Sequence, residues 1–379
     1  MNVLHKTVQP ARRVHLTGLQ VIRGVAALAV AVYHEQGLMA FGPHATPNNW
    51  FTALFKFGYS GVDVFFVLSG FLIVYVHYHD IGRPSRIGGY LWRRASRIYL
   101  FYWSLCLVLV PAVFFAPGFF VNGGKQGILR LLSSVLLLPQ SDTPLLGVTW
   151  SLQHELYFYL FFVLVIAAPR AACVAAAALL GGTLAALLTS KPIDFPWSFI
   201  FSFRNCQFAA GAAVAMFVNL FRLQPDWRVL LAVGGSLFCG TALYDDYAAV
   251  RLGLVPNMAL YGTAGCLIIW AAVVRDLDVS KVSSPAWLVG LGEASYAIYL
   301  CHYPVLVGLH KLASLWSGAR FIPQSVVLLV DSSIAVCIGV AVHLTLERRL
   351  QRWARGITAL RPNSEKTLAP VLASTQEAA

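Results

Sequence analysis

The sequence predicts an all-α membrane protein, a polytopic transmembrane helix bundle of about ten spans. The chain of 379 residues is 58% hydrophobic and only 12% charged, whereas soluble domains carry about 25% charged residues. Apolar runs of around 20 residues, the length that crosses a bilayer, recur along the chain. We therefore expect a multi-pass protein of the plasma or inner membrane, with the lipid bilayer as its main partner.

The ten expected spans run from near the N-terminus to the basic C-terminal region. They cover approximately residues 20–37, 57–78, 98–116, 148–168, 171–189, 199–221, 228–244, 252–274, 286–309 and 323–346. Segment 125–139 is too short and too interrupted to cross comfortably, and we expect an interfacial or re-entrant helix there. The first span resembles a signal peptide, but Arg23 interrupts its apolar stretch, and we expect it to remain uncleaved.

The net charge of +12 follows a pattern typical of membrane topology. Most lysines and arginines fall in segments that lie inside if the N-terminus is inside, most densely in 79–97 and after Glu347. This positive-inside bias predicts that the N- and C-termini are both cytoplasmic. Because the bias accounts for most of the basicity, we expect no nucleic-acid partner.

The composition indicates one folded unit. No shift marks a second domain, so we expect a membrane domain over residues 1–360 and a disordered cytoplasmic tail over 361–379. The seven cysteines lie within or at the edges of spans and form no CxxC pair. We therefore expect neither a disulfide framework nor a metal site.

Two ionisable residues share one face of the first span. Arg23 and His34 are eleven residues apart, about three helical turns, and thus ~16 Å apart along one face. A charge near the bilayer centre costs ~2.5–3.5 kcal/mol, which favours a polar path over a lipid-facing position. His34 is then a candidate catalytic base; the alternative is an interfacial histidine bonded to a backbone carbonyl.

Two carboxylates, Asp63 and Glu155, are expected at the depth of His34. Either could orient His34 as the acid of a catalytic triad orients its histidine, and the sequence does not choose between them. Asp63 has an alternative role as a cap of local backbone amides. Ser151 and Glu155 are four residues apart and therefore lie on one helix face.

The ninth span carries a polar stripe in which Ser295, Tyr299 and His302 follow a four-then-three spacing. An aromatic belt at the membrane interface explains Tyr299 well, but Ser295 and His302 poorly. Together with Trp150 and Ser151 of the fourth span, these residues are expected to line a substrate path.

Three arginines, Arg93, Arg94 and Arg97, precede the third span. The positive-inside bias alone explains these charges. Three guanidinium groups at the cytoplasmic end of the predicted polar path would also bind a polyphosphate such as the nucleotide of coenzyme A. No glycine-rich phosphate loop occurs in the chain, so ATP hydrolysis has no support. Arg204 and Gln207 form a further polar pair without an assigned role.

Five segments in order resemble acyltransferase family three, the integral-membrane O-acyltransferases of bacterial surface and exported polysaccharides and of related antibiotic-modifying and nodulation enzymes. They are Leu19–His34, Gly61–Leu72, Arg93–Ile98, Thr149–Glu155 and Leu291–Pro304. General similarity is greatest to the exopolysaccharide-production subgroup, in a stand-alone form. The family often has a proline or an aromatic residue soon after the basic motif. This chain has Tyr99-Leu-Phe there, without a proline.

The resemblance implies an acyl-CoA donor from the cytoplasm, a glycan hydroxyl as acceptor, and a requirement for Arg23 and His34. On that basis we expect His34 with Asp63 or Glu155 to be catalytic, and Arg23, Arg93, Arg94 and Arg97 to bind the donor. No permanently bound cofactor is expected, and the oligomeric state is left open. The alternative is a transporter or exporter that uses the same charges as a relay, although internal repeats are missing.

Overall fold

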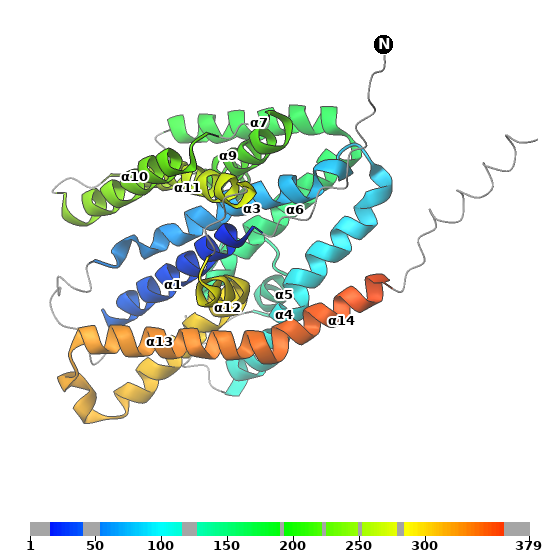
Figure 1. Ribbon diagram of the computed structural model, residues 1–379. Coiled ribbons are helices and arrows are strands. Elements are labelled where there is room, and N and C mark those ends of the chain that lie inside the picture. Colours follow the sequence, from blue (N-terminus) through cyan, green and yellow to red (C-terminus); the bar gives the residue numbers. More distant parts are fainter. Residues whose placement is uncertain are drawn as a thin grey trace, which may run out of the picture.

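The protein is a bundle of α-helices (Figure 1). The computed structural model describes residues 16–40, 54–115, 127–189, 193–221, 225–248, 252–278 and 284–359, and within them no strand occurs. The all-α fold class predicted from the sequence is therefore confirmed. The tail expected at 361–379 lies outside the described residues.

The long helices follow the expected spans closely. They are α1 (Thr17–Met39), α3 (Gly61–His77), α4 (Ile87–Phe115), α6 (Trp150–Ala167), α7 (Pro169–Leu188), α9 (Arg204–Met216), α10 (Trp227–Tyr247), α11 (Leu254–Leu277), α12 (Ala286–Ser314) and α13 (Gln324–Val342). Shorter helices are α5 (Ile128–Val135), α8 (Trp197–Ile200) and α14 (Arg348–Ala359). Short 3₁₀ segments are η1 (Lys56–Ser60), η2 (Tyr78–Asp80), η3 (Pro84–Arg86), η6 (Gly147–Thr149) and η8 (Ser317–Phe321), and π segments are η7 (Phe217–Phe221) and η9 (His343–Glu347).

Eight helical stretches among the described residues are long and apolar enough to cross a membrane. The other two expected spans correspond to α9 with η7 and to α12. Helix α12 is 29 residues long and contains the predicted polar stripe. Helix α5 has eight residues, about 12 Å of rise, and is too short for a hydrocarbon core of ~30 Å. This agrees with the expectation that segment 125–139 does not span.

The helix directions agree with alternating passage through a membrane. Helices α1 and α12 run parallel, because Gly24 approaches Gly292 near one end while His34 contacts His302 near the other. In Figure 1, α1 begins near the middle of the bundle and α14 ends at its right, and both of these helix ends face the right-hand end of the bundle. The cytoplasmic assignment of that end rests on the charge bias of the sequence.

Close backbone contacts hold the centre of the bundle together. A side chain at Gly70 of α3 would overlap the carbonyl oxygen of Phe208, and one at Gly211 of α9 would overlap that of Val67. Glycine at both positions therefore lets α3 and α9 approach closely, as small residues do in membrane helix pairs. This contact sets the positions of the polar side chains on the two helices.

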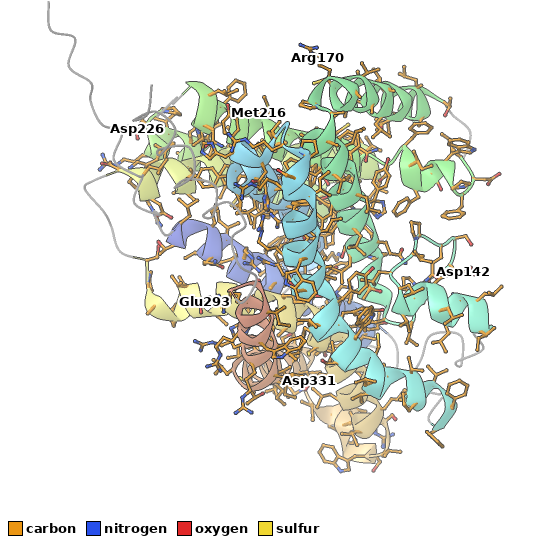
Figure 2. All side chains as sticks on the ribbon, turned by 90° about the vertical axis from the view of Figure 1, so that its right-hand side faces the viewer. Asp142, Arg170, Met216, Asp226, Glu293 and Asp331 are labelled. Carbon is orange, nitrogen blue, oxygen red and sulfur yellow. The ribbon has the colours of Figure 1, made fainter. Side chains whose placement is uncertain are left out.

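Large apolar side chains point outward from several helices. Leu107 of α4 is 78% exposed and Val174 of α7 is 72% exposed, as expected for side chains that face lipid tails. In the view of Figure 2, the charged residues Asp142, Arg170 and Asp226 lie around the rim of the bundle. The polar residues of the predicted path are instead held between helices.

Candidate active site

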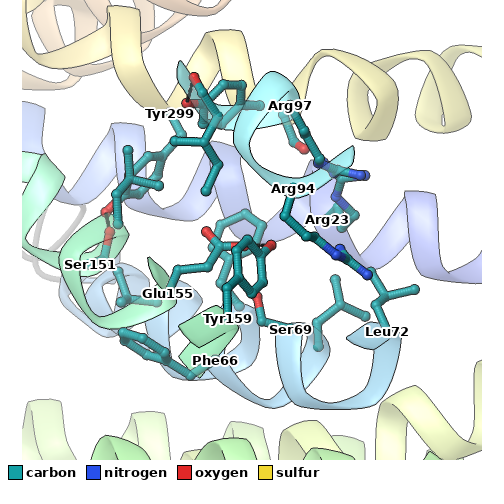
Figure 3. Close-up of a pocket in the computed structure, with 17 residues that line it drawn as sticks. Arg23, Phe66, Ser69, Leu72, Arg94, Arg97, Ser151, Glu155, Tyr159 and Tyr299 are labelled. Atoms are coloured by element: carbon teal, nitrogen blue, oxygen red, sulfur yellow. Dashed lines mark hydrogen bonds between the residues drawn. The ribbon is translucent and has the colours of Figure 1, made fainter. Parts of the chain in front are cut away.

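One pocket gathers most of the polar residues that the sequence singled out (Figure 3). About 830 Å³ of empty space lies within the pocket and its open mouth together. Helices α1, α3, α4, α6 and α12 line it. Its polar lining residues are Arg23, Ser69, Arg94, Arg97, Ser151, Glu155, Tyr159, Ser295, Tyr296 and Tyr299.

The pocket has a basic side. Arg23, Arg94 and Arg97 gather on one side in Figure 3, Ser151 lies on the opposite side, and Glu155 lies between them. The guanidinium carbon of Arg94 is 5.1 Å from the ring centre of Tyr159. Three cations with one carboxylate leave an excess of positive charge, which suits an anionic ligand.

Arg93 does not belong to this basic side. It is 53% exposed, and its guanidinium lies 3.6 Å from the carboxylate of Asp80. Helix α4 begins at Ile87, before the expected start of the third span, so all three arginines are helical. Arg93 and Arg94 lie about 100° apart around the helix, one on each side of Arg97, and the pocket is on the side of Arg94. Of the three arginines that were expected to bind the donor together, only Arg94 and Arg97 line this pocket.

Glu155 is held within the pocket by a tyrosine. The hydroxyl of Tyr159, one turn further along α6, donates a short hydrogen bond to Glu155 Oε1. Arg23 interacts electrostatically with Glu347 and, less strongly, with Glu155, and its Nη1 donates to Gln20 Oε1 at 3.2 Å. The predicted four-residue spacing thus brings Ser151 and Glu155 onto the same pocket wall.

His34 and His302 form a histidine pair beside the pocket. His302 Nε2 lies 3.1 Å from His34 Nδ1, and the ring of Tyr299, which lines the pocket, is centred 5.8 Å from that of His302. The pair therefore adjoins the end of the pocket where Ser151 and Tyr299 lie.

Hydrogen bonding determines the tautomers of the two neutral rings. His302 Nδ1 is 3.0 Å from the carbonyl oxygen of Ile298, which only accepts, so Nδ1 of His302 carries the proton. His302 Nε2 is then an acceptor, and His34 Nδ1 donates to it and to the carbonyl of Val30 at 3.0 Å. His34 Nε2 consequently keeps its lone pair and is the basic nitrogen.

Neither predicted carboxylate partner pairs with His34. Asp63 is 1% exposed, and its Oδ1 accepts hydrogen bonds from Arg204 Nη1, at short range, and from Gln207 Nε2 at 2.7 Å. Glu155 accepts from Tyr159 instead. The expected orienting acid is therefore replaced in this geometry by the His302 ring and the Val30 carbonyl.

Three of the other residues predicted for the substrate path line the pocket, and Trp150 does not. Ser151 and Tyr299 join across the pocket with their hydroxyl oxygens 2.7 Å apart. Ser295 is 1% exposed, and its hydroxyl has no hydrogen-bond partner in the described part of the chain. Trp150 lies outside the pocket lining, where the Arg204 guanidinium carbon is 5.2 Å from its ring centre.

Tyr159, Ser69 and Tyr296 also line the pocket, although none of them was predicted as a site residue. The four-residue spacing does place Tyr159 one turn beyond Glu155 on the same helix face. Ser69 and Tyr296 gave no comparable signal, since each is one polar group within an otherwise apolar or aromatic run.

Comparison with known proteins adds independent information. Residues 16–345 match a family described as "Acyltransferase domain". The chain is 27% identical over 328 residues to the exopolysaccharide production protein ExoZ of Rhizobium meliloti, covering 80% of this chain and 94% of that protein. It is 27% identical over 381 residues to the acyltransferase MdmB of Streptomyces mycarofaciens, covering 90% of this chain and 93% of that protein. No solved structure matches.

The Asp63–Arg204 pair predicts a stability defect when one partner is removed. We expect Asp63→Asn to lower the free energy of unfolding by about 3 kcal/mol, because it leaves the guanidinium of Arg204 without its buried counter-charge. A double-mutant cycle with Arg204→Met, measured by unfolding in detergent, tests this. The double variant should lose less free energy of unfolding than the two single variants lose together.

The matched control for this pair is Asp142→Asn, which breaks the surface pair of Arg130 and Asp142. There the two groups are 3.6 Å apart, Asp142 is 63% exposed, and the expected loss is at most about 1 kcal/mol. Additive losses at Asp63 and Arg204, or equal losses in the buried and surface variants, would contradict the structural role of Asp63.

Proposed function

This chain belongs to the acyltransferase family that its residues 16–345 match, and we propose on that premise that it transfers an acyl group from acyl-CoA to a hydroxyl of a surface or exported polysaccharide or glycolipid. The acyl group is of the acetyl or succinyl class. The observation that carries the proposal is one pocket with arginines on one side and the Tyr299–His302–His34 contact at the other. The similarity to ExoZ, an exopolysaccharide production protein, supports an exported polysaccharide as acceptor.

The arginines bind the donor in this proposal. Arg94 and Arg97 contact the phosphates of CoA, because guanidinium groups pair with phosphate oxygens through two parallel hydrogen bonds. Arg23, deeper along α1, contacts the more buried part of the donor. The pantetheine arm then extends through the pocket toward Ser151 and Tyr299.

His34 carries out proton transfer between the two substrates. Its Nε2 accepts the proton of the acceptor hydroxyl while that oxygen attacks the thioester carbonyl carbon. When the tetrahedral intermediate collapses, the carbon–sulfur bond breaks, and the imidazolium returns the proton to the departing CoA thiolate. His302 acts as a positioning residue, because its acceptor nitrogen keeps the proton of His34 on Nδ1.

Loss of the base is the direct test of this function. We expect His34→Ala to abolish CoA thiol release by purified protein supplied with acetyl- or succinyl-CoA and a sugar acceptor, because positioned proton transfer contributes ~10²–10⁴-fold. Expression and membrane insertion should remain at the level of the unchanged protein. Full residual transfer in the variant would contradict the mechanism. Absence of thiol release by the unchanged protein would favour the transporter alternative.

The division among the arginines gives a second prediction. Arg94→Ala and Arg97→Ala should each raise the KM for acyl-CoA by about 10- to 100-fold, since a hydrogen bond to a charged group contributes ~1.5–3 kcal/mol. Arg93→Ala is the matched control on the same helix, and its KM should change by less than about threefold, because its guanidinium lies outside the pocket. Steady-state kinetics of thiol release measures all three. An equal effect of Arg93→Ala would contradict the proposed donor site.

A further inference from the structure

We propose that Glu35, His310 and Asp331 form a binding site for a divalent metal ion, with Zn²⁺ as the preferred ion. The site joins α1, α12 and α13 at the end of the bundle where α1 finishes, toward the left of Figure 1. None of the three residues lines the active-site pocket.

The three side chains converge on one point. Each offers one ligand atom, and these atoms all lie within 4.8 Å of one another. His310 Nε2 and Glu35 Oε1 are 2.8 Å apart. The residues come from three different helices, so spacing within one helix does not account for their convergence. This spacing suits three ligands around a single small ion.

Glu35 supplies an independent indication of a missing ligand. Its side chain is 0% exposed, and its second oxygen, Oε2, has no hydrogen-bond partner in the described part of the chain. The other oxygen of the same carboxylate contacts His310. A buried carboxylate oxygen without a partner is costly, and a bound cation would satisfy it.

A second buried histidine–glutamate pair shows how the chain satisfies such a carboxylate without a metal. His343 Nδ1 is 2.6 Å from Glu347 Oε2, and Gln351 Nε2 donates to Glu347 Oε1 at 2.7 Å. Both oxygens of Glu347 therefore have protein partners, whereas one oxygen of Glu35 does not. The contrast identifies the Glu35 cluster, and not histidine–glutamate pairing in general, as the candidate.

Charge and ligand type favour zinc. With His310 neutral, the form that binds a metal, the three groups sum to a net charge of −2, which a divalent cation balances. Zn²⁺ is bound in proteins by imidazole nitrogen and carboxylate oxygen, while all-oxygen sites suit Mg²⁺ and Ca²⁺. Three protein ligands leave a fourth tetrahedral position for water.

The site would stabilise the environment of the catalytic histidine pair. Glu35 follows His34 in α1, and His310 lies two turns, about 12 Å, beyond His302 in α12. An ion that holds Glu35 and His310 to Asp331 would fix the ends of both helices that carry the pair. The cysteine pattern of the sequence predicted no metal site, and the site proposed here contains no cysteine.

Metal binding by the full-length protein in detergent tests the proposal. After treatment with a chelator, the protein is titrated with Zn²⁺, and bound metal is measured by mass spectrometry and by competition with a zinc dye. We expect one zinc per chain and a higher Tm with zinc present. Glu35→Gln and Asp331→Asn should each bind zinc at least about tenfold more weakly. Glu347→Gln, the matched control, should bind zinc as the unchanged protein does.

Two results would overturn the proposal. The first is zinc uptake well below one ion per chain in the unchanged protein, which would mean that protons or neighbouring side chains such as Lys311 balance the carboxylates. The second is unchanged zinc affinity in Asp331→Asn. This variant decides the question even if Glu35→Gln fails to fold, because Asp331 is only partly buried. Neither readout requires acyl transfer, so the outcome is separate from that of the proposed function.

Discussion

A charged side chain between apolar helices needs a counter-charge or hydrogen-bonding partners close by, and the bundle is organised by this requirement. Asp63 on α3 pairs with Arg204 on α9, and Glu347 pairs with His343 within η9. Each pairing offsets the cost of removing an ionised group from water. The consequence is that polar contacts, together with close glycine packing, fix which helices are neighbours.

The same requirement distinguishes charged groups that are paired within the bundle from charged groups that line the pocket and can contact a ligand. Asp63 is occupied by Arg204 and Gln207 and faces no cavity of the active site. Arg23, Arg94 and Arg97 instead line the active-site pocket, where Glu155 is the one lining carboxylate. Cations that outnumber anions around a cavity provide a site for an anionic ligand. This imbalance is what connects the fold to the proposed binding of a CoA donor.

Hydrogen-bond direction gives the histidine pair its chemistry. The carbonyl oxygens of Ile298 and Val30 cannot donate, so they orient the protons of both rings toward the backbone. One basic nitrogen, Nε2 of His34, remains for substrate. The backbone of two parallel helices thereby performs the orienting task that a carboxylate performs in catalytic triads.

The sequence predicted the fold class and most of the pocket, because apolar length and helical spacing are local properties. Ser151 with Glu155, and Ser295 with Tyr299, were expected on shared faces and do line one pocket. Contacts between different helices could not be predicted from local spacing, since 268 positions separate His34 from His302. Local spacing could not separate Arg93 from Arg94, because Arg97 lies about one turn from both, and only the packing of α4 shows which of them lines the pocket.

In the proposed function, acyl-CoA binds at the arginine side of the pocket and the glycan hydroxyl reacts at the side of His34. If the acceptor is exported, the two substrates reach His34 from opposite sides of the membrane. The most direct measurement uses proteoliposomes with a known orientation of the protein and labelled acetyl-CoA supplied on the side of the Arg94 and Arg97 end. The account predicts that CoA thiol appears on the donor side and that the labelled ester appears only on an acceptor enclosed on the other side. Labelled ester formed only with acceptor on the donor side would contradict it.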